Sequence, residues 1–562
     1  MIVASFAGAG SSASAATHPK PTTASSRIHP HITVPGAGVT ASAASRVSIP
    51  DATLRAGTSM AAPTVTVTDP GVITSGNTVT LTLTGSPAGV TYDTAHTPTV
   101  TVSGSGAIAG TATVTATTIT FTVSKSTTAV NAKYAVSGIF LLGPTTAVTG
   151  GVSITASYGA SGGTATTLAP FHIGAITNLI PAVYGPTAPD TAALLFRAAF
   201  PAAAAGGTGG TAGGPTSIVL ASDYAPQDAE SAAYLATAEN TGIVLTDPAG
   251  LSSAVSSVLN DYPGITTVYI VGGTSVVSNS TATALAGRSG LTVTRIAGNT
   301  QYMTNQAVYN FVKSAFPTPS TSSAVTLDYT QTKYNTTGGA SSPSSTGTVA
   351  APAGKTAIVA SGEYASYQDG IASGPLSYKD GLPLILTQPG GLDSGAMQIL
   401  ISGGYTQVIL LGGPKAVSNA VETQLTNSVA NGGAGVTVFR VAGSDATDTA
   451  QLLASLEETG ATGFGFATTD SGGGANGGGV LIARGNGFQD ALAAAPYAGR
   501  TGNTPILLTE NATTLGAPLT GYLKAQGAAG TFSIQALGGP SSLTIAVQNA
   551  AINAEVAGLP TP

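Results

Sequence analysis

The sequence contains no cysteine and no tryptophan, and only 7% of its 562 residues are charged. The absence of cysteine excludes disulfides, thiolate nucleophiles, cysteine-based zinc sites and iron–sulfur clusters. No run of about 18 or more apolar residues occurs, so no transmembrane segment is predicted. The net charge of -6 provides no basic surface of the kind that binds nucleic acid, so no nucleic-acid partner is expected.

Small residues take the place of the missing charges. Glycine accounts for 74 residues, and hydrophobic residues reach 42%. At about 100–200 residues per domain, the length predicts roughly three to five domains. Residues 1–60 are rich in Ser, Thr, Ala and Pro and show no periodicity, so we expect a signal-like or flexible N-terminal arm. Ala13-Ser14-Ala15 resembles a signal-cleavage site, although no basic segment precedes it.

Residues 61–172 show short runs in which apolar residues alternate with threonine. Examples are Thr78-Val-Thr-Leu-Thr-Leu-Thr84 and Ile119-Thr-Phe-Thr-Val123, with turn residues such as Ser75-Gly76-Asn77 between the runs. A period of two predicts half-buried strands, and about seven strands at this spacing are typical of an immunoglobulin-like β-sandwich. No catalytic pattern is visible in this range, so we expect a role in spacing or assembly.

The rest of the chain repeats one order of motifs three times, which predicts repeats at 173–290, 291–430 and 431–562. Each copy has an Asp that opens a small-residue helix, then an apolar strand, then a strand that ends in a double glycine. The double-glycine strands are Val268-Tyr-Ile-Val-Gly-Gly273, Val408-Ile-Leu-Leu-Gly-Gly413 and Ile534-Gln-Ala-Leu-Gly-Gly539. The shared residues are Asp228, Asp369, Asp490, Gly272, Gly273, Gly412, Gly413, Gly538 and Gly539. The matching order indicates tandem repeats.

Strands and helices alternate within each repeat. Ser217-Ile-Val-Leu-Ala221 is apolar almost throughout, as expected where helices cover both faces of a parallel sheet. Each repeat is therefore expected to hold about four βα pairs, which makes it a Rossmann-like α/β module. Ser278 and Ser418 follow the double glycines and are expected to be helix N-caps. Low-complexity inserts interrupt the repeats at equivalent places, at 201–216, 317–354 and 459–479.

The sequence resembles the cell-wall-binding repeat 2 family of Gram-positive surface and S-layer proteins. The resemblance covers about residues 173–551 and is carried by Arg295-Ile-Ala-Gly298 with Thr304, Asp490-Ala-Leu492, Pro505-Ile-Leu-Leu-Thr509, and Leu411-Gly-Gly-Pro414 with Val417-Ser418. The family usually carries three such repeats. The resemblance implies three modules packed as a pseudo-trimer that bind an anionic wall polymer non-covalently.

This chain departs from the family pattern in its basic residues. The family's second Arg is replaced by Ala188, Gln301 and Ala446, and its first Arg is replaced by Ala182 in repeat one. Acidic residues also outnumber basic ones in residues 173–562. The expected partner is therefore an anionic or a neutral cell-wall polysaccharide, and an anionic one requires local geometry, bridging cations or low pH.

Four arginines are the candidate polymer-binding residues: Arg295, Arg440, Arg484 and Arg500. Arg295 and Arg440 each stand next to an Ala-Gly turn, where a guanidinium can contact an anion bidentately or can brace the fold. For the three aspartates, capping of the helix that begins there is favoured over binding of polymer or metal. For the double glycines, a tight turn is favoured over a phosphate cradle, because no nucleotide-binding motif is present.

No enzyme activity, cofactor or metal site is predicted. All five histidines precede the repeats, so the repeats lack the usual nucleophile–base pairs and zinc ligands. A carboxylate-only glycosidase remains an alternative, but no carboxylate pair is marked. Three functions are therefore open: a secreted, non-enzymatic surface or S-layer protein anchored to the wall, a homo-oligomeric filament or lattice subunit, and a wall hydrolase targeted by the repeats.

Overall fold

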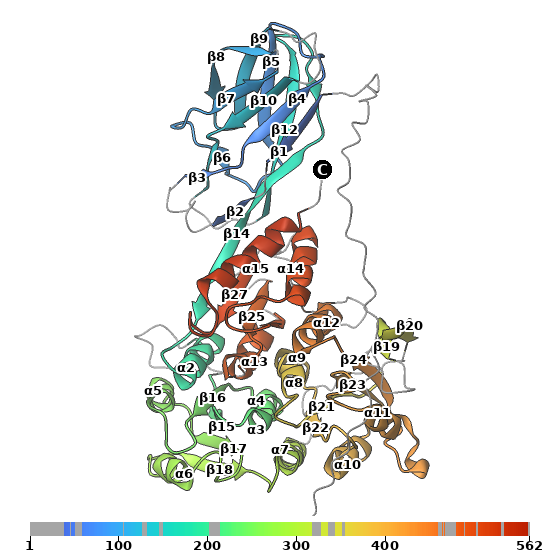
Figure 1. Ribbon diagram of the computed structural model, residues 1–562. Coiled ribbons are helices and arrows are strands. Elements are labelled where there is room, and N and C mark those ends of the chain that lie inside the picture. The colour runs from blue at the N-terminus through green and yellow to red at the C-terminus, as the bar shows by residue number, and fades with distance from the viewer. Residues whose placement is uncertain are drawn as a thin grey trace, which may run out of the picture. The chain divides into compact units, whose positions relative to one another are not determined.

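The strands of the N-terminal part form antiparallel sheets. The computed structural model describes residues 39–559, apart from 45–46, 51–58, 105, 126–131, 145–149, 202–213, 317–327, 335–342, 351–353, 459–463, 465, 467–478, 488, 502–503 and 530–532. The strands are β1 (Thr40–Ala43), β2 (Val47–Pro50), β3 (Met60–Ala61), β4 (Val65–Asp69), β5 (Asn77–Thr84), β6 (Thr91–Tyr92), β7 (Thr99–Ser103), β8 (Ala107–Val114), β9 (Thr118–Lys125), β10 (Ala132–Ser137), β11 (Phe140–Leu142), β12 (Gly150–Ala160), β13 (Thr166–Thr167) and β14 (Phe171–Val183) (Figure 1). We call residues 39–176 the β region.

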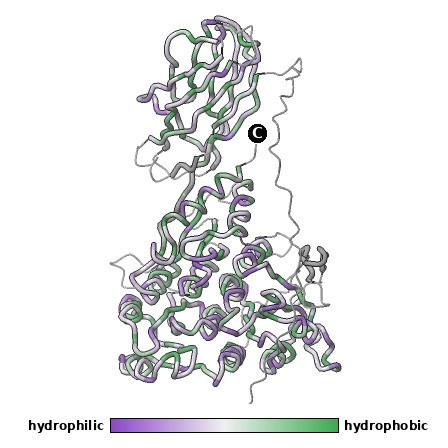
Figure 2. Tube along the Cα trace, viewed as in Figure 1, coloured by the Kyte–Doolittle hydropathy of each residue, from purple (hydrophilic) through white to green (hydrophobic). Residues whose placement is uncertain are grey.

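Three groups of antiparallel strands in the β region share one core. One sheet has the order β1-β4-β10-β7, a smaller one has the order β3-β11-β6, and the strands β12-β5-β9-β8 belong to a ten-stranded sheet that continues through β14. Val65 and Val67 of β4 and Leu81 of β5 are at most 1% exposed, whereas the threonines between them are half-buried. The alternation of apolar and polar positions is visible along the strands in Figure 2. This antiparallel part confirms the expected all-β character.

The β region begins earlier than the sequence suggests. Strand β1 pairs with β4, and β2 pairs in parallel with β14, so both strands lie inside the range 1–60 for which we expect an arm. The sequence did not predict these strands because each is only four residues long. A strand of that length has two inward-facing positions, which are too few to show an alternating pattern. The signal-like residues themselves lie outside the described part of the chain.

Residues 177–559 form the three-module unit, in which each module has a four-stranded parallel sheet. Module 1 has the strand order β16-β15-β17-β18 and module 2 the order β22-β21-β23-β24. The elements of module 1 are α2 (Ala188–Ala199), β15 (Ser217–Ser222), α3 (Pro226–Glu230), α4 (Ala232–Glu239), β16 (Ile243–Thr246), α5 (Ser253–Asp261), β17 (Thr267–Val271), α6 (Asn279–Ala286) and β18 (Thr292–Ile296). Those of module 2 are α7 (Gln301–Ala315), β21 (Thr356–Ser361), α8 (Gln368–Ile371), α9 (Gly374–Asp380), β22 (Leu384–Thr387), α10 (Ser394–Gly403), β23 (Gln407–Leu411), α11 (Asn419–Thr426), the short 3-10 helix η1 (Val429–Asn431) and β24 (Thr437–Val441).

Module 3 takes its fourth strand from the beginning of the unit. Its own elements are α12 (Ala446–Glu458), β25 (Val480–Arg484), α13 (Gln489–Thr501), β26 (Ile506–Thr509), α14 (Ala517–Ala529), β27 (Ser533–Leu537) and α15 (Ile545–Ala557). The strand order is β26-β25-β27-β14, and the second half of β14 runs parallel to β27. The first half of β14 pairs antiparallel with β12, so one strand belongs to both the β region and module 3.

The fourth strand of each sheet lies outside the repeat boundaries drawn from the sequence. Strand β18 falls beyond residue 290, β24 beyond residue 430, and β14 at the start of the first repeat rather than the end of the third. Each fourth strand leads into a helix that packs on a strand of the next module: α7 contacts β22, α12 contacts β26, and α2 contacts β16. The three-module unit is thus closed by its own first strand and helix.

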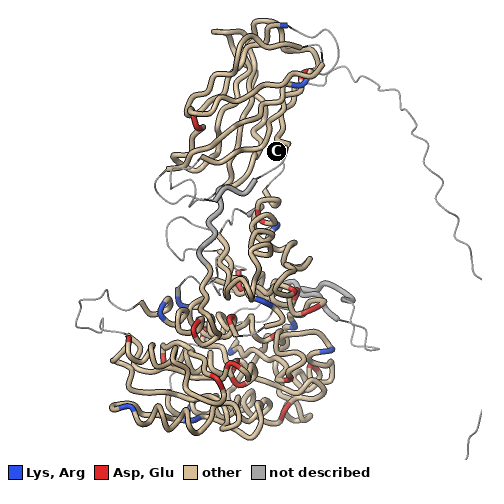
Figure 3. Tube along the Cα trace, turned by 60° about the vertical axis from the view of Figure 1, so that its left-hand side comes forward, with Lys and Arg blue, Asp and Glu red and all other residues tan. Residues whose placement is uncertain are grey.

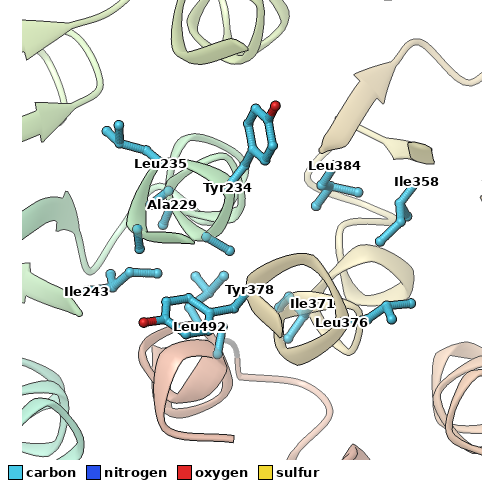
Figure 4. Close-up of a cluster of buried hydrophobic side chains, with 14 of the residues drawn as sticks. Ala229, Tyr234, Leu235, Ile243, Ile358, Ile371, Leu376, Tyr378, Leu384 and Leu492 are labelled. Atoms are coloured by element: carbon cyan, nitrogen blue, oxygen red, sulfur yellow. The ribbon is translucent and has the colours of Figure 1, made fainter. Parts of the chain in front are cut away.

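Charged side chains are sparse, and small helices fill the centre. Figure 3 shows scattered Lys, Arg, Asp and Glu residues, most of them in the three-module unit. Helices α4, α9 and α13, one from each module, contact one another. Their apolar residues, including Leu235, Leu376 and Leu492, meet in the cluster of Figure 4 and are at most 5% exposed. Small residues permit this approach: Gly374 of α9 lies against Ala495 of α13.

The inserts contribute little to the described structure. Strands β19 (Asp328–Tyr334) and β20 (Pro343–Ala350) pair with each other within the second insert. Most other insert residues lie outside the described part of the chain. Among the helices that the structure describes, none has both the length and the hydropathy needed to cross a bilayer.

Candidate functional site

The three repeated aspartates lie in the first turns of the helices that follow the first strand of each sheet. Asp228 and Asp369 are each 8% exposed. The expectation that they cap these helices is wrong for both, because the N-cap residues of α3 and α8 are Ala225 and Tyr367, and neither cap has a side-chain hydrogen bond. The carboxylates instead point toward the double-glycine turn and the following loop, which calls for another explanation of the repeated Asp.

Each aspartate accepts a hydrogen bond from a threonine near the start of the helix that follows the fourth strand. Thr304 donates to Asp228, Thr449 to Asp369 and Thr191 to Asp490. The same hydroxyls accept backbone N–H groups, from Gly298 and Gly443 at 3.1 Å and from Gly185 at 3.0 Å. In module 3 the threonine comes from the start of the unit, more than 290 positions before its aspartate in the sequence. The repeated Asp therefore joins the helix after the first strand to the helix after the fourth strand and, through the threonine, to the loop before that helix.

The first glycine of each pair makes room for that aspartate. Gly272, Gly412 and Gly538 have φ values of 114°, 95° and 94°, a region that favours glycine. A Cβ on Gly412 would lie 2.6 Å from the Asp369 Oδ2 atom. Their N–H groups donate to carbonyls of the adjacent fourth strand, at 2.9–3.0 Å. These N–H groups are used within the sheet, so the tight-turn interpretation explains the motif better than a phosphate cradle.

The second glycine of each pair begins the turn into the next helix. The carbonyls of Gly273, Gly413 and Gly539 accept N–H groups three and four residues later. Ser278 follows as the predicted N-cap and its side chain accepts the Thr281 N–H at 3.2 Å. Ser418 occupies the same N-cap position of α11 but has no side-chain capping bond. The predicted cap positions are thus confirmed, and the capping interaction is present in module 1.

Burial raises the pKa of all three repeated aspartates. The pKa of Asp369 rises to about 6, with burial as the main cause, while the Thr449 hydrogen bond opposes the shift. Burial likewise raises the pKa of Asp228 and Asp490, and the hydrogen bonds they accept oppose it. The hydrogen bonds and the burial of these carboxylates indicate a structural role.

Arg295 and Arg440 brace the double-glycine turns. The Arg440 Nη1 donates to the carbonyls of Gly412 at 2.7 Å and Val417 at 2.8 Å, and its Nε contacts the Glu422 carboxylate at 2.9 Å. Arg440 is 4% exposed. Arg295 is half-buried and donates to the carbonyl of Gly272 at 2.8 Å. Of the two roles left open by the sequence, these contacts favour bracing over polymer binding.

The other two arginines differ from each other. Arg500 joins module 3 to module 1, because it donates to the Ala199 carbonyl and the Asn240 side chain and lies 4.6 Å from the Phe200 ring centroid. Arg484 ends β25 and is half-buried. Among the described residues, its guanidinium forms no hydrogen bond or ion pair, and its charge acts on Asp490 and Tyr367. Of the four predicted arginines, Arg484 therefore has the side chain most available to a ligand.

The loops after the first strands carry residues that the sequence analysis did not single out. Tyr224 follows β15 and is 70% exposed, and Tyr364 follows β21 and is 64% exposed. Asp223, beside Tyr224, is 9% exposed, and its Oδ1 atom has no hydrogen-bond partner among the described residues. Burial, and secondly the charge of Asp247, raises the pKa of Asp223 to about 6. An aromatic residue directly after a buried strand was the available signal for these positions.

A buried carboxylate also lies at the centre of the unit. Glu230 of α3 is 3% exposed, and neither carboxylate oxygen has a hydrogen-bond partner within the described residues. It lines a cavity of about 10 Å³ together with Gly370, Ile371 and Leu492. Burial raises the pKa of Glu230 well above its ordinary value, and the charge of Asp369 adds to the effect. The corresponding residues of the other two modules are the apolar Ile371 and Leu492.

Within the described ranges, no three His, Asp or Glu side chains gather closely enough to hold a metal ion. The repeats offer instead buried carboxylates, bracing arginines and exposed tyrosines at the carboxyl ends of the sheets. Such an edge can bind a ligand by stacking and hydrogen bonding.

Comparison with known families gives three matches in this chain. The family described as Cell wall binding domain 2 matches residues 183–282, 295–422 and 440–548. The matched segments together cover more than half of the chain, and their boundaries contain the three sets of repeated motifs.

One curated protein and two solved structures are similar to parts of this chain. N-acetylmuramoyl-L-alanine amidase LytC of Bacillus subtilis is 30% identical over 194 residues, and the match covers 34% of this chain and 33% of that protein. Cwp6 from Clostridium difficile is 12% identical with a TM-score of 0.48, covering 93% of this chain and 69% of the other. Cwp8 from the same organism is 15% identical with a TM-score of 0.46, covering 88% and 89%. The chain thus spans about a third of the length of its curated relative.

Proposed function

Since the chain belongs to the Cell wall binding domain 2 family, we propose that it is a non-enzymatic surface protein attached non-covalently to a cell-wall polysaccharide through its three modules. The observation that carries the proposal is the threefold family match, which coincides with the three parallel sheets. In this proposal the protein is secreted and resides at the wall or outer surface. The β region then serves as the part that is presented away from the polymer.

The finer architecture belongs to the same proposal. We interpret the three modules as a pseudo-trimer, which is supported by the mutual contacts of α4, α9 and α13 and by the step from each fourth strand to the next module. We interpret the β region as an immunoglobulin-like sandwich, which is supported by one core shared between antiparallel sheets. Three linked modules suit attachment by several weak contacts, because linkage raises the effective concentration of each.

The decisive experiment is co-sedimentation of the purified chain with isolated cell walls. We expect the whole chain to sediment with walls and an acidic protein of similar size to remain in solution. A whole chain that stays in solution over pH 5–8 and at low salt contradicts the proposal. The same walls, incubated and assayed for released reducing ends and amino groups, test the absence of hydrolysis, since release that a single Asp or Glu substitution abolishes would establish an enzyme.

The surface-layer role needs a separate test. Electron microscopy of the purified protein, with and without wall fragments, distinguishes an anchored component from a self-assembling lattice or filament subunit. Ordered arrays on wall fragments are the expected result for an S-layer component. Arrays that form equally well without wall material favour self-assembly as the primary function.

A further inference from the structure

The loops that follow the first strands of the three modules meet at one place. The Gln489 side chain, which opens α13 of module 3, donates to the Asp223 carbonyl of module 1 at 3.3 Å. In the same module 3 loop, the charge of Arg484 acts on Tyr367 of module 2. The module 3 loop therefore lies beside both of the others. We call the surface formed by residues 222–225, 362–367, 484–487 and 489 the axial surface.

Two tyrosines present their rings to solvent on the axial surface. Tyr224 and Tyr364 are more exposed than any other large hydrophobic side chain in the described chain, at 70% and 64%. Their loops are fixed by equivalent bonds: Tyr224 N–H donates to Ser222 Oγ at 3.1 Å, and Glu363 N–H donates to Ser361 Oγ at 3.2 Å. The Tyr364 ring also rests on Tyr367, with centroids 5.4 Å apart. A tyrosine held in this way offers a rigid amphipathic face at little entropic cost.

Hydrogen-bonding groups lie in two of the three loops of the axial surface. The buried Asp223 Oδ1 atom lacks a partner among the described residues, and buried polar atoms without partners are uncommon in folded proteins. Arg484 supplies donors in the module 3 loop. A carboxylate acceptor, a guanidinium donor and an exposed ring together match a ligand that has both hydroxyl groups and an apolar C–H face, which describes a sugar ring.

The charge of this surface argues against an anionic ligand. The loops of the axial surface carry the carboxylates of Asp223 and Glu363, against the single cation Arg484. A polymer with a regular negative charge would be repelled by the carboxylates that are ionised and would find one cation in return. A ligand without charge meets no such penalty.

We propose that the axial surface binds a neutral wall glycan, with sugar rings stacked on Tyr224 and Tyr364. This inference rests on the proposed wall-binding function and adds the ligand class and the residues. It differs from attachment to an anionic polymer in a measurable way. Stacking and hydrogen bonding to a neutral chain are insensitive to salt, whereas ionic contacts between exposed charges weaken as salt is added.

The test compares variants of the whole chain on two kinds of wall. One preparation is intact, and the other is stripped of phosphate polymers with acid and has its remaining carboxyl groups reduced. We expect the native chain to bind both preparations within about threefold, at 0.05 and 0.5 M NaCl alike. Changing both Tyr224→Ala and Tyr364→Ala should weaken binding by about tenfold or more, because two stacked rings are lost. Changing both to Phe should keep it within about threefold.

A matched control removes exposed apolar groups elsewhere. The double variant Val429→Ala and Ile545→Ala alters side chains that are each 56% exposed, and it should bind like the native chain. Native binding that is lost on stripped walls, or that falls steeply with salt, overturns the neutral-glycan inference while leaving wall attachment intact. Unchanged binding by the folded Tyr-to-Ala double variant overturns the assignment of the site. Failure of the native chain to bind intact walls contradicts the proposed function itself.

Discussion

The β region and the three-module unit differ in the hydrogen bonding of their buried carboxylates. In the β region, Asp69 Oδ1 accepts the backbone N–H groups of residues 71, 72 and 73 at 2.7–3.1 Å, while its buried Oδ2 has no hydrogen-bond partner among the described residues. In the three-module unit, Glu230, Glu457 and Glu555 are each at most 3% exposed and each has a carboxylate oxygen without a partner in the described chain. Burial raises the pKa of all three well above the ordinary value.

This difference has a consequence for stability and pH. A carboxylate whose pKa is raised by folding favours the folded state fully below its unfolded pKa, about 4.3, and that contribution is lost as the pH rises through the folded pKa. We therefore expect the three-module unit to be most stable in mild acid. The β region should change less over the same range, because residues 39–176 contain no glutamate.

The largest expected effect comes from separating the two regions. A chain that begins at residue 184 lacks the half of β14 that pairs with β27, so module 3 loses its fourth strand. We expect a loss of unfolding free energy of about 4 kcal/mol or more, since a sheet edge and the core beneath it are exposed. A chain that begins at residue 177 retains this pairing and is the control. Urea unfolding measures both, and equal stability would show that the pairing contributes nothing.

Replacement of the buried Arg440 should have the second-largest effect on the free energy of unfolding. Arg440→Ala leaves the Gly412 and Val417 carbonyls without a donor and Glu422 without its ion pair, so we expect a loss of about 2–4 kcal/mol. Arg295→Ala should cost about 1–2 kcal/mol, because Arg295 is half-buried and makes fewer contacts. Chemical unfolding at pH 7 gives both values. A larger loss for Arg295→Ala than for Arg440→Ala would mean that the burial of the arginine does not determine how much it stabilises the double-glycine turn.

Replacement of the central carboxylate should stabilise the unit. Glu230→Leu gives module 1 the apolar residue that module 3 carries as Leu492, so the folded state gains about 1–3 kcal/mol at pH 8. Below the unfolded pKa of about 4.3 the gain should shrink, since Glu230 is neutral there in both states. The measurement is urea unfolding of native and variant chains across this pH range. Ile371→Glu is the converse change and should destabilise the unit more at pH 8 than at pH 5.

The smallest effect is expected for the repeated threonine. Thr449→Val removes the hydroxyl that joins Asp369 to the Gly443 N–H, and we expect a loss of about 1–2 kcal/mol. Thr120→Val in the β region alters a half-buried position on β9 and should stay within about 0.5 kcal/mol. Thermal unfolding of the two variants compares the regions directly. Equal losses of unfolding free energy would show that the hydrogen bonds from Gly443 through Thr449 to Asp369 do not contribute specially to stability.

Local patterns were enough to predict several strands of each module but not the module to which each fourth strand belongs. The apolar runs before the double glycines became β17, β23 and β27, and the alternating threonine runs became antiparallel strands. The pairing of β14 with β27 could not be predicted from the sequence. The two strands are about 350 positions apart, and neither segment contains a pattern that indicates its partner. The roles of Arg440 and Glu230 were hidden for a related reason, since a charged residue in a sequence is ordinarily expected at the surface.

The double membership of β14 has an evolutionary consequence. Each fourth strand is followed by the helix that packs on the next module, and the chain returns to module 1 through β14 and α2. Duplication or deletion of a single repeat would leave one sheet without its fourth strand or one helix without its sheet. A change in copy number would therefore expose a sheet edge or an apolar helix face, so the fold couples the three repeats to one another even where their residues differ, as at Glu230, Ile371 and Leu492.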